Sequence, residues 1–281
     1  MKLTIGSQVY PWHQYYQRRH ENVSDRLDET LAQVAEAGLD SWEQIVETDA
    51  DADRLGPLLE KHGLSYPSSY VGATLHEEPW REQAQHVLNA ARCAKRLGAS
   101  IVVCNPNPID WQGDADKDDR QLRTQAEALR WLTDAMADEG LTLAYHTHDA
   151  EMRNAARELH HMMLATVARD GEGREMKLCC DAHWLFRGAG HSNVAFADLM
   201  QLYGHRIASL HLRQSQDGVW TESLDQGDDL DYLPLVDTLR SLDFEGPAII
   251  ETAFEAGTPL ELDMVESHKR SATWILARFL A

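Results

Sequence analysis

Short apolar runs, each followed by a stretch with helical periodicity, recur along the chain from end to end. The segment Ser24–Ala37 is typical of the helical stretches, because its apolar residues recur with the spacing of one helix face. Ser24 can cap the start of this helix and Gly38 can end it. The pattern therefore predicts alternating strands and amphipathic helices.

The apolar runs predict eight short strands spaced about 35 residues apart. Runs such as Ile101–Cys104 are hydrophobic at every position, as a parallel sheet buried on both faces requires. The predicted strands are Leu3–Val9, Leu39–Val46, Leu64–Val71, Ser100–Asn105, Leu141–His146, Met176–Asp181, Arg206–Leu212 and Pro247–Glu251.

Eight strand–helix units in about 250 residues are the arithmetic of a TIM barrel. A doubly wound sheet usually has fewer strands and a glycine-rich phosphate-binding turn, and no GxGxxG or GxxxxGK[ST] motif occurs. No linker, low-complexity segment or block of charge marks a second domain. We therefore expect residues 1–281 to form a single α/β domain, a (β/α)8 TIM barrel.

The composition argues for a folded protein and against nucleic-acid binding and membrane insertion. Hydrophobic residues make up 43% of the 281 residues, enough for a full core. The formal charge of −20 disfavours nucleic acid, whose backbone is bound through Lys and Arg. The apolar runs fall short of the ~18 residues that span a bilayer, and the N-terminus lacks a signal-peptide pattern. We expect a cytoplasmic protein with no membrane or nucleic-acid partner.

The cysteines offer no site of their own. The four are Cys93, Cys104, Cys179 and Cys180, and no two form a CxxC pair. The sequence therefore predicts neither a disulfide framework nor a thiolate metal site.

Ligand-type side chains stand at the carboxyl ends of the last four predicted strands, where the active site of a TIM barrel lies. His146 ends the fifth strand, Asp181 the sixth and Glu251 the eighth, while His211 lies near the end of the seventh. Taken alone, each has an ordinary explanation: Asp181 can cap a helix, and Glu251 can pair with Arg213. Four consecutive strand ends that supply Glu151, Asp181, His211 and Glu251 are harder to explain in this way.

Three carboxylates that converge in one pocket would repel each other and partly protonate unless a cation lies between them. The candidates are Glu151, Asp181 and Glu251, joined by the imidazole of His211. The combination predicts one divalent metal ion. Oxygen-rich ligation with one imidazole favours Mn²⁺, Mg²⁺ or Co²⁺, with Zn²⁺ as the further candidate.

The strand-end series resembles that of the xylose-isomerase-like TIM barrels known as sugar phosphate isomerases/epimerases. Within them it is most similar to the branch related to inosose dehydratases and keto-sugar lyases. The segments that carry the resemblance are His146–Glu151, Asp181–Trp184, Leu210–Arg213 and Glu251. The resemblance covers nearly the whole chain, and it is specific for the superfamily but not for a substrate. It implies a metal set of Glu151, Asp181, His211 and Glu251.

Two departures from the family pattern bear on this set. The epimerases carry a glutamate on the fifth strand itself, where this chain has His146, with Glu151 five residues later. His146 or His148 can therefore bind the metal or act as the base instead of Glu151. On the seventh strand, Arg213 and Gln214 replace the usual lysine and aspartate, which changes the polar groups facing the substrate.

Further residues near strand ends are candidates to bind the substrate. Histidine and arginine side chains can bind hydroxyls or a phosphate, tryptophans can form an apolar wall, and a glutamate can bind a hydroxyl or cap a helix. The candidates are His148, His183, Trp184, Arg213, Glu43 and Trp12. The segment Asn105–Arg120 reads as a long loop over the mouth, a candidate lid.

These residues favour a metal-dependent isomerase or epimerase that acts on a ketose or related polyhydroxy-carbonyl compound through an enediolate. The metal would polarise the carbonyl, and Glu151, Glu251 or His146 would take the proton from the neighbouring carbon. The main alternative is a metal-dependent dehydratase or lyase on a keto-inositol or keto-sugar, because an additional imidazole can protonate a leaving group.

Two further alternatives are weaker. An endonuclease-IV-like DNA repair enzyme would need more histidine ligands and a basic face. A non-catalytic sugar-binding barrel would have kept the fold and lost the chemistry. A small carbohydrate is the expected partner, and a homo-oligomer is left open.

Overall fold

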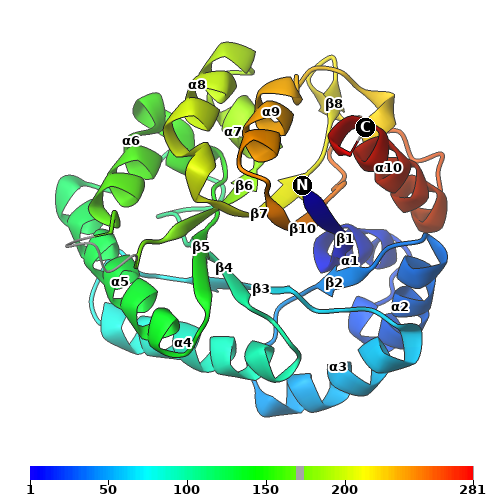
Figure 1. Ribbon diagram of the computed structural model, residues 1–281, viewed down its shortest axis with the longest axis horizontal. Helices are drawn as coiled ribbons and strands as arrows, with labels where there is room; N and C mark the ends of the chain where they lie inside the picture. Colours follow the sequence, from blue (N-terminus) through cyan, green and yellow to red (C-terminus); the bar gives the residue numbers. More distant parts are fainter. Residues whose placement is uncertain (169–173, 281) are drawn as a thin grey trace.

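The computed structural model describes residues 1–168 and 174–280. Its main sheet has eight strands, which curve into a nearly closed barrel surrounded by helices (Figure 1). The strands are β1 (Lys2–Gln8), β2 (Ser41–Glu43), β3 (Ser68–Ala73), β4 (Ile101–Pro106), β5 (Thr142–Tyr145), β6 (Lys177–Asp181), β7 (Ile207–Leu212) and β10 (Glu245–Ile250). Their order is β2-β1-β10-β7-β6-β5-β4-β3, and all paired neighbours are parallel. The predicted TIM barrel is confirmed.

The helices lie outside the barrel strands. They are α1 (Val9–Gln17), α2 (Leu27–Glu36), α3 (Asp49–His62), α4 (Trp80–Arg96), α5 (Asp119–Asp138), α6 (Asp149–Ala165), α7 (Ala182–Gly188), α8 (Asn193–Tyr203), α9 (Leu233–Ser241) and α10 (Met264–Phe279). A hairpin of β8 (Ser215–Gln216) and β9 (Val219–Trp220) follows β7. Among the described residues, no helix is both long and apolar enough to cross a membrane.

The buried apolar side chains of the barrel form two clusters. A small cluster of Val103, Ala144 and Cys179 comes from three neighbouring strands and is fully buried. A much larger cluster joins the opposite faces of the strands to the helices. Burial on both faces explains why the strands read as continuous apolar runs.

The elements start and end within a few residues of the expected positions, with two differences. The predicted helix Ser24–Ala37 begins as a 3₁₀ turn at Val23–Arg26, capped by the Asn22 side chain, before α2. Strand β2 keeps only three residues of the predicted run Leu39–Val46.

The barrel closes at a seam between β2 and β3, where backbone pairing is sparse. Trp42 N donates to Ser65 O (3.0 Å) and Tyr70 N donates to Gln44 O (3.2 Å). On the other side of β2, Gly6 of β1 lies so close that a Cβ atom there would stand 2.1 Å from Ser41 Oγ. The short β2 is thus held mainly by its contact with β1.

Candidate metal and substrate site

Four polar side chains meet at the carboxyl ends of four adjacent strands. His146 follows β5, Asp181 ends β6, His211 lies in β7 and Glu251 follows β10. One ligand atom of each lies within 4.8 Å of the others, and all four residues are buried. The register places Asp181 beside His211, and Glu251 N donates to Leu212 O, so strand pairing itself brings the group together.

His146 is the member of this cluster that most clearly lacks a partner. Both of its ring nitrogens are buried without a hydrogen-bond partner among the described residues, and Nε2 lies 3.6 Å from Asp181 Oδ2. A buried polar group left unpaired carries a desolvation cost. Two imidazoles and two carboxylates are a donor set that divalent transition metals accept, so the residues present fit a metal ion.

Glu43 of β2 orients the second imidazole. Its Oε1 lies 2.8 Å from His211 Nε2, and its Oε2 accepts from Ser68 Oγ. Burial would lower the pKa of His211, but Cys179 and Glu43 outweigh this effect and raise it well above its ordinary value. With Nε2 turned to Glu43, Nδ1 is the nitrogen that faces Glu251 Oε2, at 3.2 Å.

Arg213 places a fixed positive charge between the two carboxylates. Its Nη2 lies 2.6 Å from Glu251 Oε2 and 3.2 Å from Asp181 Oδ2. Burial alone would raise the pKa of both carboxyl groups, but Arg213 outweighs it, lowering the pKa of Glu251 to about 2 and that of Asp181 well below its usual range. Both groups are therefore carboxylates at neutral pH.

Asp181 and Glu251 make the structural contacts expected of a helix cap and an ion pair, and both also belong to the buried cluster. Asp181 Oδ1 accepts from Trp184 N at 2.9 Å and caps α7, while Oδ2 faces the cluster. Glu251 pairs with Arg213 as expected of neighbouring strands. Neither contact removes these carboxylates from the cluster.

Glu151 lies outside the cluster, in the first turn of α6. Its Oε2 accepts from His148 N at 2.6 Å, and its buried Oε1 has no partner among the described residues. Burial and the neighbouring Glu158 raise the pKa of Glu151 to about 7. The structure thus groups His146, rather than Glu151, with the other three residues.

A cavity of about 490 Å³ lies beside the cluster. Glu251 of the cluster and its ion-pair partner Arg213 are among the residues that line it. Six of its fourteen lining residues are Phe, Tyr or Trp: Tyr10, Tyr70, Trp111, Trp184, Trp220 and Phe254. The remaining lining residues are Gln8, Val9, Gln14, Ile45, His148 and Asp149. Burial and His146 lower the pKa of His148 to about 3, so its imidazole is neutral at pH 7.

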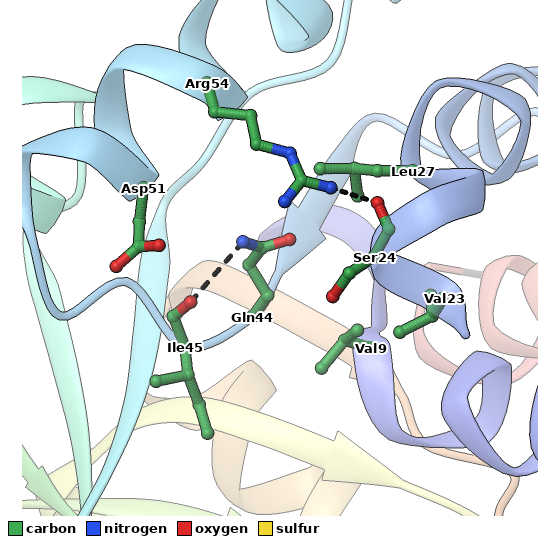
Figure 2. A pocket seen from close by; sticks show the side chains of 8 residues that line it. All are labelled: Val9, Val23, Ser24, Leu27, Gln44, Ile45, Asp51 and Arg54. Atoms are coloured by element: carbon green, nitrogen blue, oxygen red, sulfur yellow. Dashed lines mark hydrogen bonds between the residues drawn. The ribbon is translucent and has the colours of Figure 1, made fainter.

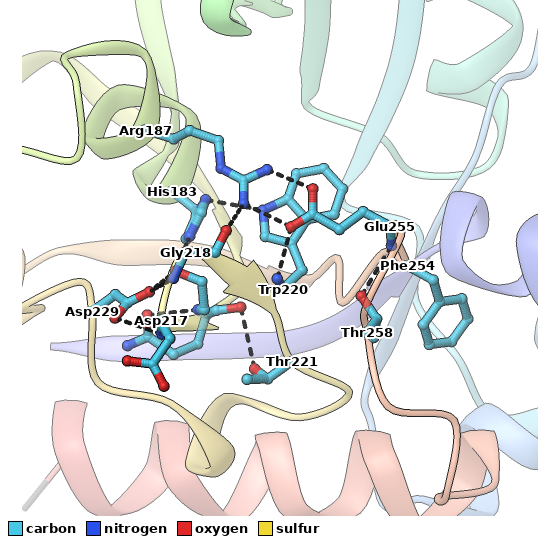
Figure 3. A network of polar contacts seen from close by, with 12 residues as sticks. His183, Arg187, Asp217, Gly218, Trp220, Thr221, Asp229, Phe254, Glu255 and Thr258 are labelled. Carbon is cyan, nitrogen blue, oxygen red and sulfur yellow. Dashed lines mark hydrogen bonds and ion pairs between the residues drawn. The ribbon is translucent and has the colours of Figure 1, made fainter.

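Trp220 is held on the cavity wall by a polar network (Figure 3). Its Nε1 donates to His183 Nδ1 at 3.3 Å, and His183 Nε2 lies 2.9 Å from Ser215 Oγ, which donates to Asp229 Oδ2. Trp220 N donates to Glu255 Oε1 at 2.8 Å. Burial and Arg213 lower the pKa of His183 to about 3, so it acts as a neutral link.

Sequence reasoning missed Trp220 although a signal was present. The dipeptide Asp217-Gly218 connects β8 and β9, and both residues have positive φ (54° and 82°). Asp-Gly is the preferred sequence for such two-residue hairpin turns. The hairpin places Trp220 opposite Trp184, with ring centroids 5.3 Å apart.

The predicted substrate-binding residues divide into two groups. His148, Trp184 and Arg213 line the cavity. Glu43 and His183 are buried, Glu43 beside His211 and His183 beside the cavity residue Trp220. Trp12 is fully buried, donates from Nε1 to Ser7 Oγ at 2.8 Å and packs on His268. The predicted loop runs from β4 to α5 and brings Trp111 to the mouth.

A second hollow, of about 200 Å³, lies beside the end of β2 (Figure 2). Its polar side chains are engaged locally: Asp51 belongs to the capping box of α3, and Arg54 donates to Ser24 O. Gln44 Nε2 donates to Ile45 O. With no histidine or cysteine in its lining, this hollow does not compete with the larger cavity as a catalytic site.

Comparison with known proteins agrees with this geometry. A family model described as xylose isomerase-like TIM barrel matches residues 31–275. An inosose dehydratase from Geobacillus thermodenitrificans (strain NG80-2) is 22% identical over 252 residues, which cover 80% of this chain and 81% of the relative.

Two solved structures illustrate the similarity of fold. D-allulose 3-epimerase from Methylomonas sp. has a TM-score of 0.75 at 15% identity, covering 99% of this chain and 98% of its own. The 3-keto-D-glucoside 4-epimerase from E. coli has a TM-score of 0.68 at 14% identity, covering 98% of this chain and 100% of its own.

Proposed function

Because this chain belongs to the family of xylose isomerase-like TIM barrels, we propose that it is a metal-dependent isomerase or epimerase of a ketose or related polyhydroxy-carbonyl compound. The observation that carries the proposal is the buried cluster at the strand ends, in which neither ring nitrogen of His146 has a hydrogen-bond partner among the described residues. We also propose that it acts in the cytoplasm on a small carbohydrate.

We assign the metal to His146, Asp181, His211 and Glu251. The second imidazole, which takes the place of a carboxylate, shifts the preference from Mg²⁺ towards Mn²⁺, Co²⁺ and Zn²⁺. When bound, such an ion polarises a substrate carbonyl and makes the neighbouring C–H more acidic.

The chain's own residues then move the proton. Arg213 and His211 engage Oε2 of Glu251, which leaves Oε1 of this cavity-lining residue to take the proton from the carbon beside the carbonyl. Return of the proton to the adjacent carbon isomerises the sugar. His148, a neutral imidazole on the cavity wall, is the candidate for proton transfer on the other face.

A dehydratase is the second candidate, and His148 is the observation that favours it. The neutral imidazole of His148 could first take the proton from the carbon beside the carbonyl and then, as the imidazolium, give it to a departing hydroxyl, which leaves as water. The inosose dehydratase relative points in the same direction.

The test combines metal analysis with proton exchange. Purified protein should contain about one equivalent of Mn, Co or Zn, and an Asp181→Ala/His211→Ala variant should contain none. The loaded protein is then incubated in D₂O with a panel of ketoses and inososes. Deuterium uptake into a sugar that keeps its molecular formula supports an isomerase or epimerase. A product that is lighter by one water supports the dehydratase. Absence of both metal and exchange would refute the proposal.

A further inference from the structure

We propose that the substrate is an uncharged glycoside whose reacting sugar ring carries a ketone and lies in the inner part of the cavity, with a second ring, sugar or aromatic, on the rim. This inference rests on the proposed function for the identity of the site. It deepens that proposal by naming the substrate class.

The charges that line the cavity exclude a phosphate. Among the described residues, Arg213 is the only Lys or Arg in its wall, and Glu251 and Asp181 already engage its guanidinium. Asp149 and Glu251 contribute further carboxylates. A phosphate is bound by free Arg, Lys or backbone N–H groups, and the described wall offers no second Lys or Arg to bind it.

The helix N-termini beside the cavity are also engaged by the chain itself. Asp181 accepts from Trp184 N at the start of α7, and Glu151 accepts from His148 N at the start of α6. These amides are the groups that most often bind an anion at the end of a barrel strand. The inner part of the cavity is therefore suited to an uncharged ligand.

The inner wall offers aromatic faces to such a ligand. Trp184 and Trp220 stand at 82° to each other and form a corner, with Tyr70 also in the wall. The guanidinium groups of Arg213 and Arg187 lie 4.5 Å and 4.7 Å from the Trp220 ring centroid, so the partly exposed Trp184 and Tyr70 are the more accessible surfaces. A sugar ring presents an apolar C–H face that can lie against an aromatic surface, while its hydroxyls point to the polar cluster.

The rim of the same cavity exposes apolar side chains to water. Tyr10, Ile45 and Trp111 are 46%, 48% and 58% exposed, and they come from the chain after β1, β2 and β4. The ring of Trp111 lies 5.1 Å from that of His148, so the rim continues directly into the inner wall. An exposed apolar patch that borders a binding cavity indicates a ligand surface. A single ligand that extends from the polar cluster to this rim therefore needs a second ring in addition to the reacting sugar ring.

The segment that carries Trp111 is anchored on α6. Asn154 Nδ2 donates to Asp116 Oδ2 at 2.6 Å, and Arg153 Nη2 donates to Gly113 O at 3.1 Å. Trp111 is therefore presented by a loop whose base is fixed. A cavity of about 490 Å³ lies within the range of clefts that enclose drug-sized ligands.

Calorimetric binding to the metal-loaded full-length protein tests the inference with three probes. Methyl β-D-glucoside carries one ring, 4-nitrophenyl β-D-glucoside adds a second, and methyl β-D-glucoside 6-phosphate adds a charge; none of the three has a free carbonyl. We expect the nitrophenyl glucoside to bind at least about tenfold more tightly than the methyl glucoside, and the phosphate to bind most weakly. In Trp111→Ala, the advantage of the nitrophenyl glucoside should disappear while binding of the methyl glucoside is retained.

Trp131→Phe is the matched control, because Trp131 packs partly buried on α5 and does not line the cavity. It should keep the affinity order of the wild type. Equal affinity for the methyl and nitrophenyl glucosides would overturn the assignment of the rim, and tightest binding of methyl β-D-glucoside 6-phosphate would overturn the charge argument. A dimer in light scattering that Trp111→Ala dissociates would show that a second copy covers the rim, which also overturns the inference.

These outcomes are separate from failure of the proposed function. Affinities are measured without turnover, so the order of the three probes stands or falls on its own. Missing metal and missing deuterium exchange with every ketose would count against the function.

Discussion

The carboxylate of Glu43 lies 2.8 Å from the imidazole of His211, although 168 residues separate them in the sequence. Both are fully buried, one on β2 and the other on β7. A metal-binding histidine commonly gives its second nitrogen to a carboxylate, which fixes the ring and strengthens the metal bond. Glu43 is thus a positioning residue for the proposed metal site.

Glu43→Gln should lower metal affinity by about 10- to 100-fold, because the amide keeps the shape but loses the charge that strengthens His211 as a ligand. Competition with a chromophoric chelator measures this change. Glu47→Gln is the control, since Glu47 is exposed and pairs with His86. Equal affinities for the wild type and Glu43→Gln would contradict the role of Glu43.

His146→Ala should remove the metal, whereas Glu151→Gln should retain it. The imidazole of His146 lies in the cluster. The carboxylate of Glu151 lies outside it and accepts a hydrogen bond from His148 N. Elemental analysis of both purified variants decides the matter. The reverse result would return Glu151 to the metal set.

Glu151 should also make stability depend on pH. Its pKa is raised from 4.5 to about 7 by burial, so ionisation opposes folding. The penalty is absent below about pH 4.5, grows as the pH rises and is complete above about pH 7, where it is on the order of 3 kcal/mol. Glu151→Gln should therefore be more stable than the wild type at pH 8 and not at pH 4. Urea unfolding at the two pH values tests the sign.

Replacing only one member of the ion pair between Lys117 and Glu158 should destabilise the folded protein. The two atoms lie 2.7 Å apart, and both residues are buried. Lys117→Met leaves an unpaired buried carboxylate, which should destabilise the protein by about 3–5 kcal/mol. Lys117→Met/Glu158→Gln should recover much of this loss. If the double variant unfolds as easily as the single one, the charge is not the cause.

The barrel was predictable because its strands are apolar on both faces, and Asp181, His211 and Glu251 were predictable because they stand where those strands end. The number of strands and the end of the barrel that bears the site follow from local pattern alone. The structure confirms the fold that the pattern and the resemblance imply.

Other features depend on side-chain direction, which strand periodicity does not give. Trp12 stands after the first strand as a cavity residue would, but it falls in α1 and turns into the core. His183 was expected to reach the substrate, yet it is buried and holds Trp220 instead. The contact of Glu43 with His211 depends on the closed curvature of the sheet, so no local window of sequence contains it.

The seam between β2 and β3 gives the barrel a place to open. Glu43 bonds Ser68 across that seam with one oxygen and His211 with the other, while few backbone hydrogen bonds join the two strands. Amide protons at Ser41–Glu43 should therefore exchange with solvent earlier than those of β6 or β7. An ion that fixes His211 would also steady Glu43 and slow this exchange. The metal ion proposed for the reaction would then also hold the barrel closed at this seam.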